Sequence, residues 1–200
     1  MRKIICHGDS LTEGADIESA YRWPSLLKNA LGGIEVINTG IGGDSTAGLL
    51  SRFTTDVVSH EPDAVILMGG TNDFWWDIPV NIVMANLYSM AYQAQHHGIA
   101  PVFGLPMPFD LDKAAKQPWS PPESGYDRLL GNVQSLRQKL AAAAEESEIP
   151  VLDFFRLFMD DGGQVSPALF LEDGVHPNGR GHREMAVLAA SELRKHFLMP

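Results

Sequence analysis

The sequence of 200 residues predicts an α/β fold built on a mainly parallel sheet of five strands. Short apolar runs of strand length alternate along the chain with longer segments in which apolar residues recur at helical spacing. Helices of that length allow consecutive strands to run parallel through right-handed crossovers. No repeat, low-complexity tract or linker interrupts the alternation, so residues 1–200 are expected to form a single domain.

Five apolar runs, most of them flanked by glycine or polar residues, are expected to be the strands. The strongest of them opens after the pair Pro62-Asp63. In chain order the expected strands cover residues 3–7, 34–38, 64–68, 100–105 and 151–154.

The segments between these runs show the three- and four-residue spacing of amphipathic helices. They cover residues 21–31, 45–60, 80–97, 126–147 and 179–197. The faces expected to be buried carry Leu50, Phe53 and Val57; Val83, Leu87, Met90 and Ala94; Leu129, Val133, Leu136, Leu140 and Ala144; and Met185, Leu188 and Leu193. The proline-rich stretch 106–122 is the longest irregular segment, and we expect it to form a loop beside the functional site.

Charge and the N-terminus bear on partners and location. The formal net charge of −10 would repel a phosphate backbone, so we expect no nucleic-acid partner. The apolar run before His7 has only three residues, whereas a signal peptide needs about 7–15 and a transmembrane helix roughly 20. We therefore expect a cytoplasmic protein without a stable membrane anchor. The single cysteine, Cys6, cannot form an internal disulfide and is expected to be a buried core residue.

Glycine-rich or polar clusters follow four of the five expected strands. They are residues 8–12 (GDSLT), 38–44 (NTGIGGD), 69–73 (GGTND) and 173–177 (DGVHP). Ligands of open parallel sheets bind outside the carboxyl ends of the strands, where all four clusters are expected to lie.

Two of these clusters hold residues suited to nucleophilic catalysis. A tight turn past the first strand would expose the Ser10 hydroxyl, although a serine after Gly-Asp is also a common helix cap. Asp173 stands three residues before His176 and could orient that ring and stabilise its cationic form, as in a Ser-His-Asp triad. Of the other histidines, His7 is expected at a strand end. The rest are expected to be solvated or structural: His60, His96, His97, His182 and His196.

The remaining two clusters hold hydrogen-bond donors. Gly42-Gly43 could bring a backbone N–H close to a ligand, and Asn72 carries an amide donor on a glycine-flanked loop. The alternatives are a plain turn capped by Asp44 or Ser45, and a structural turn asparagine.

Together the four clusters resemble the GDSL esterase/lipase family, the SGNH hydrolases, whose blocks contribute Ser, Gly, Asn and His in this chain order. The resemblance implies a flavodoxin-like three-layer α/β/α fold and a serine esterase that works through an acyl-enzyme without metal or other cofactor. Ser10, His176 and Asp173 would be nucleophile, base and orienting acid. The backbone N–H groups of Ser10 and Gly43 and the Asn72 amide would form the oxyanion hole. Thr12 departs from the serine of many members.

The family spans esterases, lipases, lysophospholipases, thioesterases, carbohydrate acetylesterases and acyltransferases, so the resemblance leaves the substrate open. A small or short-chain acyl ester is favoured because 200 residues leave little room for a lid domain. The aromatic residues Phe74, Trp75, Trp76 and Trp119 are expected to line the substrate pocket. Met107 and Phe109 could form a second wall, and residues 162–171 a third; burial or an oligomer contact is the alternative for the aromatic run.

Two other functions remain possible from the residues alone. A metallophosphoesterase could use Asp9, Asp44, Asp73, His7 and His176 as ligands, although the first strand lacks the Asp-x-His pair of such enzymes. A non-catalytic carbohydrate- or lipid-binding domain could share the fold. The sequence leaves the acyl group, the leaving group and the oligomeric state open.

Overall fold

The computed structural model describes residues 2–198. Its five strands form one parallel sheet in the order β2-β1-β3-β4-β5, which is the flavodoxin-like order. They are β1 (Lys3–Gly8), β2 (Glu35–Asn38), β3 (Ala64–Met68), β4 (Ala100–Leu105) and β5 (Val151–Asp153). The expected α/β fold with a five-stranded parallel sheet is confirmed.

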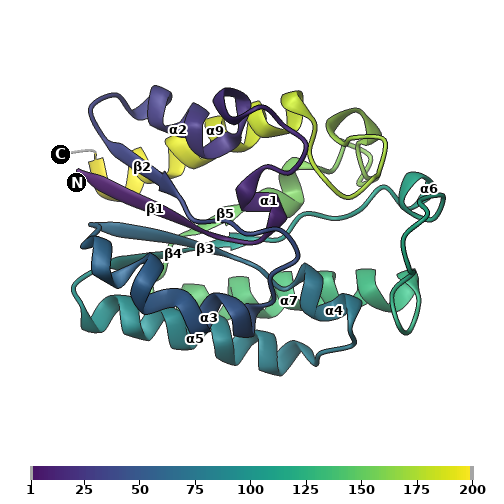
Figure 1. Cartoon of the computed structure of the whole chain (residues 1–200), viewed down its shortest axis with the longest axis horizontal. Coiled ribbons are helices and arrows are strands. Elements are labelled where there is room, and N and C mark those ends of the chain that lie inside the picture. Colours follow the sequence, from purple (N-terminus) through teal and green to yellow (C-terminus); the bar gives the residue numbers. More distant parts are fainter. Residues whose placement is uncertain (1, 199–200) are drawn as a thin grey trace.

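Helices cover both faces of the sheet and make the three layers visible in Figure 1. Helices α2 (Trp23–Leu31) and α9 (Gly179–Leu193) lie on one face, and α3 (Thr46–Asp56), α5 (Val80–His96) and α7 (Tyr126–Glu146) lie on the other. Four helices of four or five residues were not expected from the sequence. They are α1 (Ser10–Glu13), α4 (Thr71–Trp75), α6 (Leu111–Ala114) and α8 (Phe154–Leu157).

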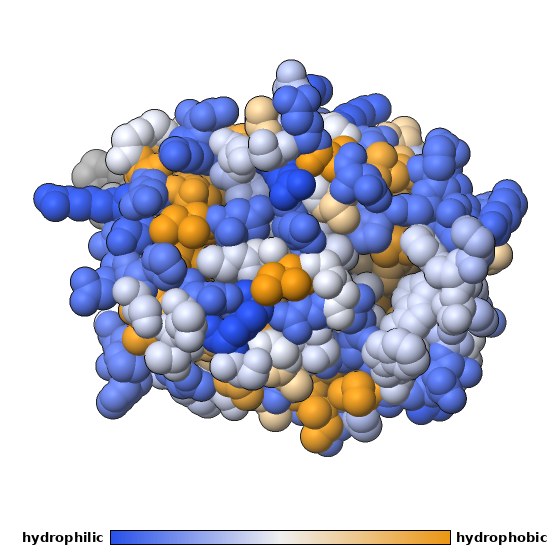
Figure 2. Space-filling view, in the orientation of Figure 1, coloured by the Kyte–Doolittle hydropathy of each residue, from blue (hydrophilic) through white to orange (hydrophobic). Residues whose placement is uncertain are grey.

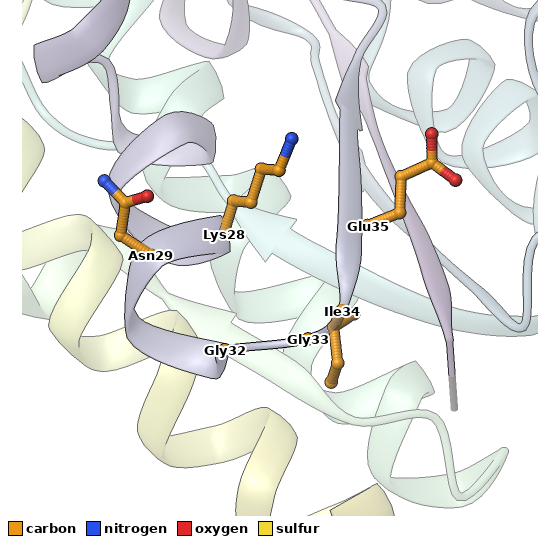
Figure 3. A pocket seen from close by; sticks show the side chains of 6 residues that line it. All are labelled: Lys28, Asn29, Gly32, Gly33, Ile34 and Glu35. Carbon is orange, nitrogen blue, oxygen red and sulfur yellow. The ribbon is translucent and has the colours of Figure 1, made fainter.

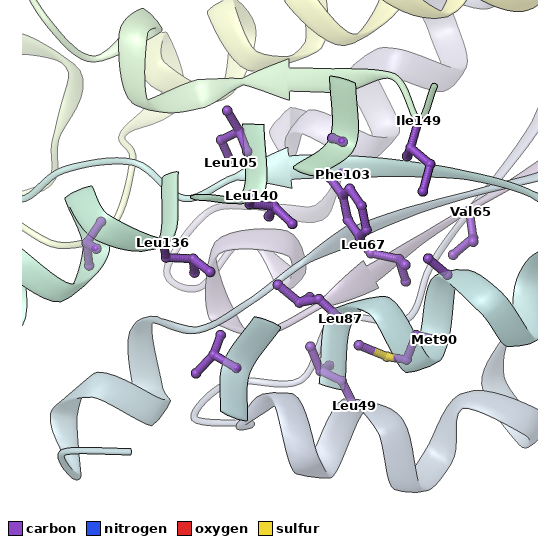
Figure 4. Close-up of a cluster of buried hydrophobic side chains, with 14 of the residues drawn as sticks. Leu49, Val65, Leu67, Leu87, Met90, Phe103, Leu105, Leu136, Leu140 and Ile149 are labelled. Carbon is purple, nitrogen blue, oxygen red and sulfur yellow. The ribbon is translucent and has the colours of Figure 1, made fainter. Parts of the chain in front are cut away.

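The core consists of two apolar layers separated by the sheet. Successive strand residues point to opposite faces, so Val65 and Leu67 enter one layer and Ile66 enters the other. The first layer packs against the stripes of α5 and α7, all of whose expected core residues are buried (Figure 4). Burial on both faces explains why β3 is apolar throughout.

Two expected helices end several residues earlier in the structure than the sequence predicted. The segment 45–60 divides into α3 and a 3₁₀ turn (Val58–His60), and the segment 179–197 leaves α-helical geometry after Leu193. In α3 the fully buried leucine is Leu49, and Leu50 is only half-buried; in α9, Leu188 is likewise half-buried. The other expected residues of these two stripes, Phe53, Val57, Met185 and Leu193, are buried as predicted.

The register of the central strands brings the first and third motifs to the same place. Gly8 at the end of β1 lies opposite Met68 at the end of β3. Strand β2 lies on one side of β1 and strand β3 lies on the other, so the order in which strands are added to the sheet reverses here. Open α/β sheets bind ligands at such a switch point. Within residues 2–198, none of the helices combines the length and the apolar character needed to cross a membrane.

Candidate active site

Ser10 opens helix α1, two residues beyond the end of β1. Asp9 caps this helix, because its Oδ1 accepts the backbone N–H of Leu11 at 2.9 Å. Ser10 is half-buried, whereas Asp9 is fully buried. The structure thus gives the capping role to Asp9, and the Ser10 hydroxyl is left available for another contact.

The loop that carries His176 is held by its own backbone and by α6. Leu171 N–H donates to the carbonyl of His176 at 2.8 Å, and Asp110 N–H donates to the carbonyl of Gly174 at 2.8 Å. Gly174 has a φ of +72°, and a Cβ there would lie 2.3 Å from the carbonyl oxygen of Asp110. Only glycine meets both conditions, so this residue lets the loop lie directly against α6.

Asp173, His176 and Ser10 form a continuous hydrogen-bonded chain. Asp173 Oδ2 lies 2.7 Å from His176 Nδ1, and His176 Nε2 lies 2.9 Å from Ser10 Oγ. The second carboxylate oxygen, Oδ1, accepts the backbone N–H of Val175 at 2.8 Å and that of His176 at 2.9 Å. The carboxylate therefore fixes both the loop and the ring, and the ring presents Nε2 to the serine.

Burial and hydrogen bonding act in opposite directions on the two carboxyl groups near this chain. Burial opposes ionisation of Asp173, but the hydrogen bonds from the His176 ring and from the backbone together hold the pKa of Asp173 below its usual value. Asp173 is thus an anion at neutral pH. Burial raises the pKa of Asp9 to about 7, although the N–H of Leu11 and the nearby His176 lower it.

Gly43 and Asn72 border the same site from the loops after β2 and β3. Gly43 has a φ of +79°, a conformation that favours glycine, and Ser45 rather than Asp44 caps the helix that follows. Asn72 Nδ2 donates to the carbonyl of Asp44 at 2.9 Å. An amide nitrogen carries two hydrogens, so one N–H of Asn72 remains for a ligand. The backbone N–H groups of Ser10 and Gly43 have no hydrogen-bond partner among residues 2–198.

A cavity of about 610 Å³ lies over these groups. On the face shown in Figure 2, the surface is hollowed at the carboxyl edge of the sheet, and the recess carries apolar atoms between hydrophilic rims. The residues that line the cavity come from five separate parts of the chain. They are Ser10, Ala15, Gly42, Gly43, Thr71, Asn72, Trp75, Trp76, Trp119, Ser120, Val175 and His176. A volume of this size is typical of a pocket for a small molecule.

Residues 6–184 match the family model of the GDSL-like Lipase/Acylhydrolase family. The chain belongs to this family. It is accordingly a serine hydrolase acting on ester bonds, as the resemblance of its four motifs predicted.

Two relatives and one solved structure illustrate the similarity. The chain is 29% identical to an arylesterase of Vibrio mimicus, over 98% of this chain and 90% of the relative. It is 28% identical to an acetylxylan esterase of Geobacillus stearothermophilus, over 82% of this chain and 72% of the relative. The crystal structure of a member of the lipolytic protein G-D-S-L family from Veillonella parvula superposes with a TM-score of 0.79, at 28% identity and full coverage of both chains.

Several residues expected to line the substrate pocket of this GDSL family member lie elsewhere. Phe74 points from α4 into the core, since consecutive helical residues point in different directions. Of the aromatic run 74–76, only Trp75 and Trp76 line the cavity. Met107 and Phe109 are also buried core residues. The segment 162–171 does not border the cavity. The expectations for these residues were wrong, and that for Trp119 agrees with the cavity lining.

The residues considered as metal ligands have other partners. Asp73 accepts the backbone N–H and the hydroxyl of Thr46, at 2.9 and 2.6 Å. His7 is fully buried, with Nδ1 2.9 Å from Thr39 Oγ1 and Nε2 3.0 Å from the carbonyl of Leu49. In residues 2–198, no three histidine, cysteine or carboxylate side chains are grouped as a metal site would require.

Two other buried titratable residues, Cys6 and His182, also have structural positions. Cys6 is buried in the core as expected, and burial raises the pKa of its thiol. His182 was expected to be solvated or structural and is structural: it is fully buried, and its Nδ1 accepts the backbone N–H of Trp23 at 3.1 Å. Burial lowers the pKa of both His7 and His182 to about 4, so both are neutral at physiological pH.

Proposed function

We propose that Ser10, His176 and Asp173 are the catalytic residues of an esterase for small or short-chain acyl esters. The observation that carries the proposal is the unbroken hydrogen-bonded chain from the Asp173 carboxylate through His176 to Ser10, at 2.7 and 2.9 Å, beside a pocket of about 610 Å³. A nucleophile, a base and a group that orients the base within hydrogen-bond reach are the signature of an activated serine.

In the first half of the reaction, Ser10 Oγ attacks the ester carbonyl carbon while His176 Nε2 takes the hydroxyl proton. Asp173 holds the ring in the required tautomer and stabilises the imidazolium. The tetrahedral oxyanion accepts hydrogen bonds from the backbone N–H groups of Ser10 and Gly43 and from the Asn72 amide. When the intermediate collapses, His176 gives its proton to the departing alkoxide, and the acyl group stays on Ser10.

In the second half, water takes the place of the alcohol. His176 removes one proton from the water as it attacks the acyl-enzyme carbonyl, and the same donors stabilise the second oxyanion. Collapse expels the serine oxygen, which recovers the proton from His176. The products are the free acid and the regenerated Ser10.

The preference for small or short-chain acyl esters is supported by the pocket walls. Trp75 and Trp119 pack edge to face with their ring centres 6.1 Å apart, and Trp75 Nε1 donates to the carbonyl of Ser120 at 3.1 Å. Fixed aromatic walls favour flat or short apolar groups and leave little freedom for a long chain. Relatives named arylesterase and acetylxylan esterase act on esters of such groups, and we extend this to the present chain.

Hydrolysis of phenyl acetate together with labelling by a small organophosphonate tests the proposal. We expect turnover, and we expect the label on Ser10 with activity lost in proportion to labelling. A label on Ser45 or Ser120, or no loss of activity on labelling, would contradict the assignment. Acetyl thioesters and acceptor alcohols, run in parallel, distinguish an esterase from a thioesterase or an acyltransferase.

A cytoplasmic location and the lack of a nucleic-acid partner belong to the same proposal. The lack of a nucleic-acid partner is supported by the net charge of −10, which would repel a phosphate backbone. Fractionation of the producing cells tests the location. Recovery of the protein with membranes or outside the cell would contradict it.

A further inference from the structure

Arg52 on α3 lies behind the proposed oxyanion hole and bonds to both loops that form it. Its Nε lies 2.8 Å from Asp44 Oδ2, and its two terminal nitrogens donate to the carbonyls of Thr39 at 2.7 Å and Gly8 at 3.0 Å. A fourth bond, at 2.6 Å, reaches Asp56 one turn along the same helix. The side chain of Arg52 is only 16% exposed.

The acceptors of Arg52 are the points that set the geometry of the site. Gly8 ends β1 and is followed directly by Asp9 and Ser10. Thr39 and Asp44 are the two ends of the loop that carries Gly43. A single planar guanidinium therefore joins the nucleophile's strand to the loop of the proposed oxyanion donor.

The contacts continue from Asp44 to Asn72. The carbonyl of Asp44 accepts one N–H of the Asn72 amide at 2.9 Å, while the carboxylate of Asp44 is held by Arg52. The bond to the carbonyl fixes the orientation of the Asn72 amide, because a carbonyl accepts only from a donor and so must lie beside the amide nitrogen and not beside the amide oxygen. Movement of Asp44 would thus move or turn the proposed oxyanion donor.

We propose that Arg52 is a positioning residue of the oxyanion hole, which acts through Asp44 on Asn72. The inference rests on the proposed function. An arginine that served only to stabilise α3 would need Asp56 alone, whereas three of the four acceptors lie in the strand and loop that place the site. Displacement of a reacting group by about 1 Å can cost on the order of 100-fold in rate.

The experiment compares Arg52→Met, Arg52→Lys, Asn72→Ala and the double variant Arg52→Met/Asn72→Ala in phenyl acetate hydrolysis. We expect Arg52→Met to lower kcat about 10- to 100-fold with KM changed less than about threefold. Lysine should restore only part of this, since a point charge cannot make the four bonds. In the Asn72→Ala background, the same Arg52→Met change should cost less than about threefold, because the donor it positions is gone.

The matched control is Arg137→Met. Arg137 also forms a half-buried bidentate pair, with Asp153 at 2.6 and 3.1 Å, away from the cavity. Its loss should lower the melting temperature and leave kcat within about twofold. If Arg52→Met does not fold, Arg52→Lys in both backgrounds makes the same test.

Three outcomes of these measurements distinguish the role of Arg52 from the role of Asn72. A folded Arg52→Met enzyme with normal kcat, or an equal loss in both backgrounds, overturns the role of Arg52 and leaves the proposed function in place. Normal kcat in Asn72→Ala overturns the role of Asn72 and the inference with it. A low kcat in Asn72→Ala, with a small further loss in the double variant, supports both.

Discussion

Two cavities of the same volume, about 610 Å³ each, lie at opposite edges of the sheet. One lies over Ser10 and His176 at the carboxyl edge. The other lies at the amino edge, between α2 and β2, and is lined by Lys28, Asn29 and Glu35 with their neighbours in the turn (Figure 3). In that view the charged ends of Lys28 and Glu35 lie on opposite sides of β2 and do not converge.

The difference shows that a functional site requires side chains from several parts of the chain to converge, and that the volume of a cavity is not enough. The lining of the Lys28 cavity comes from one connection of the chain, residues 28–35, and most of it is exposed to solvent. The Ser10 cavity gathers groups from five distant segments, because the loops after parallel strands all end at one edge. Only there can a base and a nucleophile 166 residues apart be held at 2.9 Å.

The largest effect on kcat is expected from a substitution beside the Ser10 cavity. Asp173→Asn should lower kcat by about 10⁴-fold, because an amide facing His176 Nδ1 favours the tautomer whose Nε2 cannot accept the serine proton. Asp160→Asn is the control, since Asp160 also accepts a loop N–H but contacts no histidine. Steady-state kinetics on both purified variants makes the measurement. Similar kcat in the two variants would remove Asp173 from the mechanism.

Next in size is the loss of the Asn72 amide. Asn72→Ala should lower kcat and kcat/KM together by about 10²–10³-fold with KM nearly unchanged, because the amide meets charge that exists only in the transition state. Asn29→Ala, at the other cavity, should leave both constants unchanged. A turn asparagine would instead lose about 1 kcal/mol of stability and keep its kcat.

A further test uses the pH dependence of stability, because the protein interior near the Ser10 cavity holds histidines that are neutral at physiological pH. Burial lowers the pKa of His182 to about 4, so between pH 6.5 and pH 4 the unfolded chain binds a proton there that the folded chain does not. The stability contributed by His182 is therefore complete above pH 6.5 and is lost as the pH falls toward 4. Between pH 7.5 and pH 5 this amounts to about 2 kcal/mol.

Chemical denaturation of the wild type and of His182→Gln at pH 7.5 and pH 5 isolates this contribution. His7 loses stability in the same direction, and Asp9, whose pKa burial raises to about 7, gains it on acidification. Both residues are present in both proteins, so their effects cancel in the difference. An equal loss in the two proteins would mean that His182 is not neutral in the folded state.

A smaller effect is expected at the pocket wall. Trp119→Ala should raise kcat/KM for hexanoate relative to acetate esters by about tenfold, because removing the ring opens room for methylenes. Acetate hydrolysis itself should change little. A chain-length profile of phenyl esters makes the measurement, and an unchanged profile would place the specificity elsewhere.

The smallest effect is expected at the Lys28 cavity. Lys28→Ala and Glu35→Gln should each change kcat/KM by less than about twofold, because exposed substitutions away from a site change free energies by about 0.5 kcal/mol or less. A larger loss in phenyl acetate hydrolysis would show that this cavity is coupled to catalysis and would break the comparison.

Short-range patterns in the sequence were enough to predict much of the molecule. The bounds of β3 and β4 were predicted to the residue, because apolar runs flanked by turn residues depend on neighbours in the chain. The pair Asp173 and His176 could also be recognised, since three residues within one loop already place a carboxylate beside the ring. Expectations based on such local spacing held best.

Packing across the chain decided what local spacing could not. The run Phe74-Trp75-Trp76 was expected to face one pocket, but its helical turn sends Phe74 into the core and the tryptophans to the cavity. The segment 106–122 was expected to line the site with Met107 and Phe109, yet its larger contribution is α6, which supports the loop of His176. The three bonds of Arg52 to Asp44, Thr39 and Gly8 were likewise invisible, because they join residues that only the folded sheet brings together.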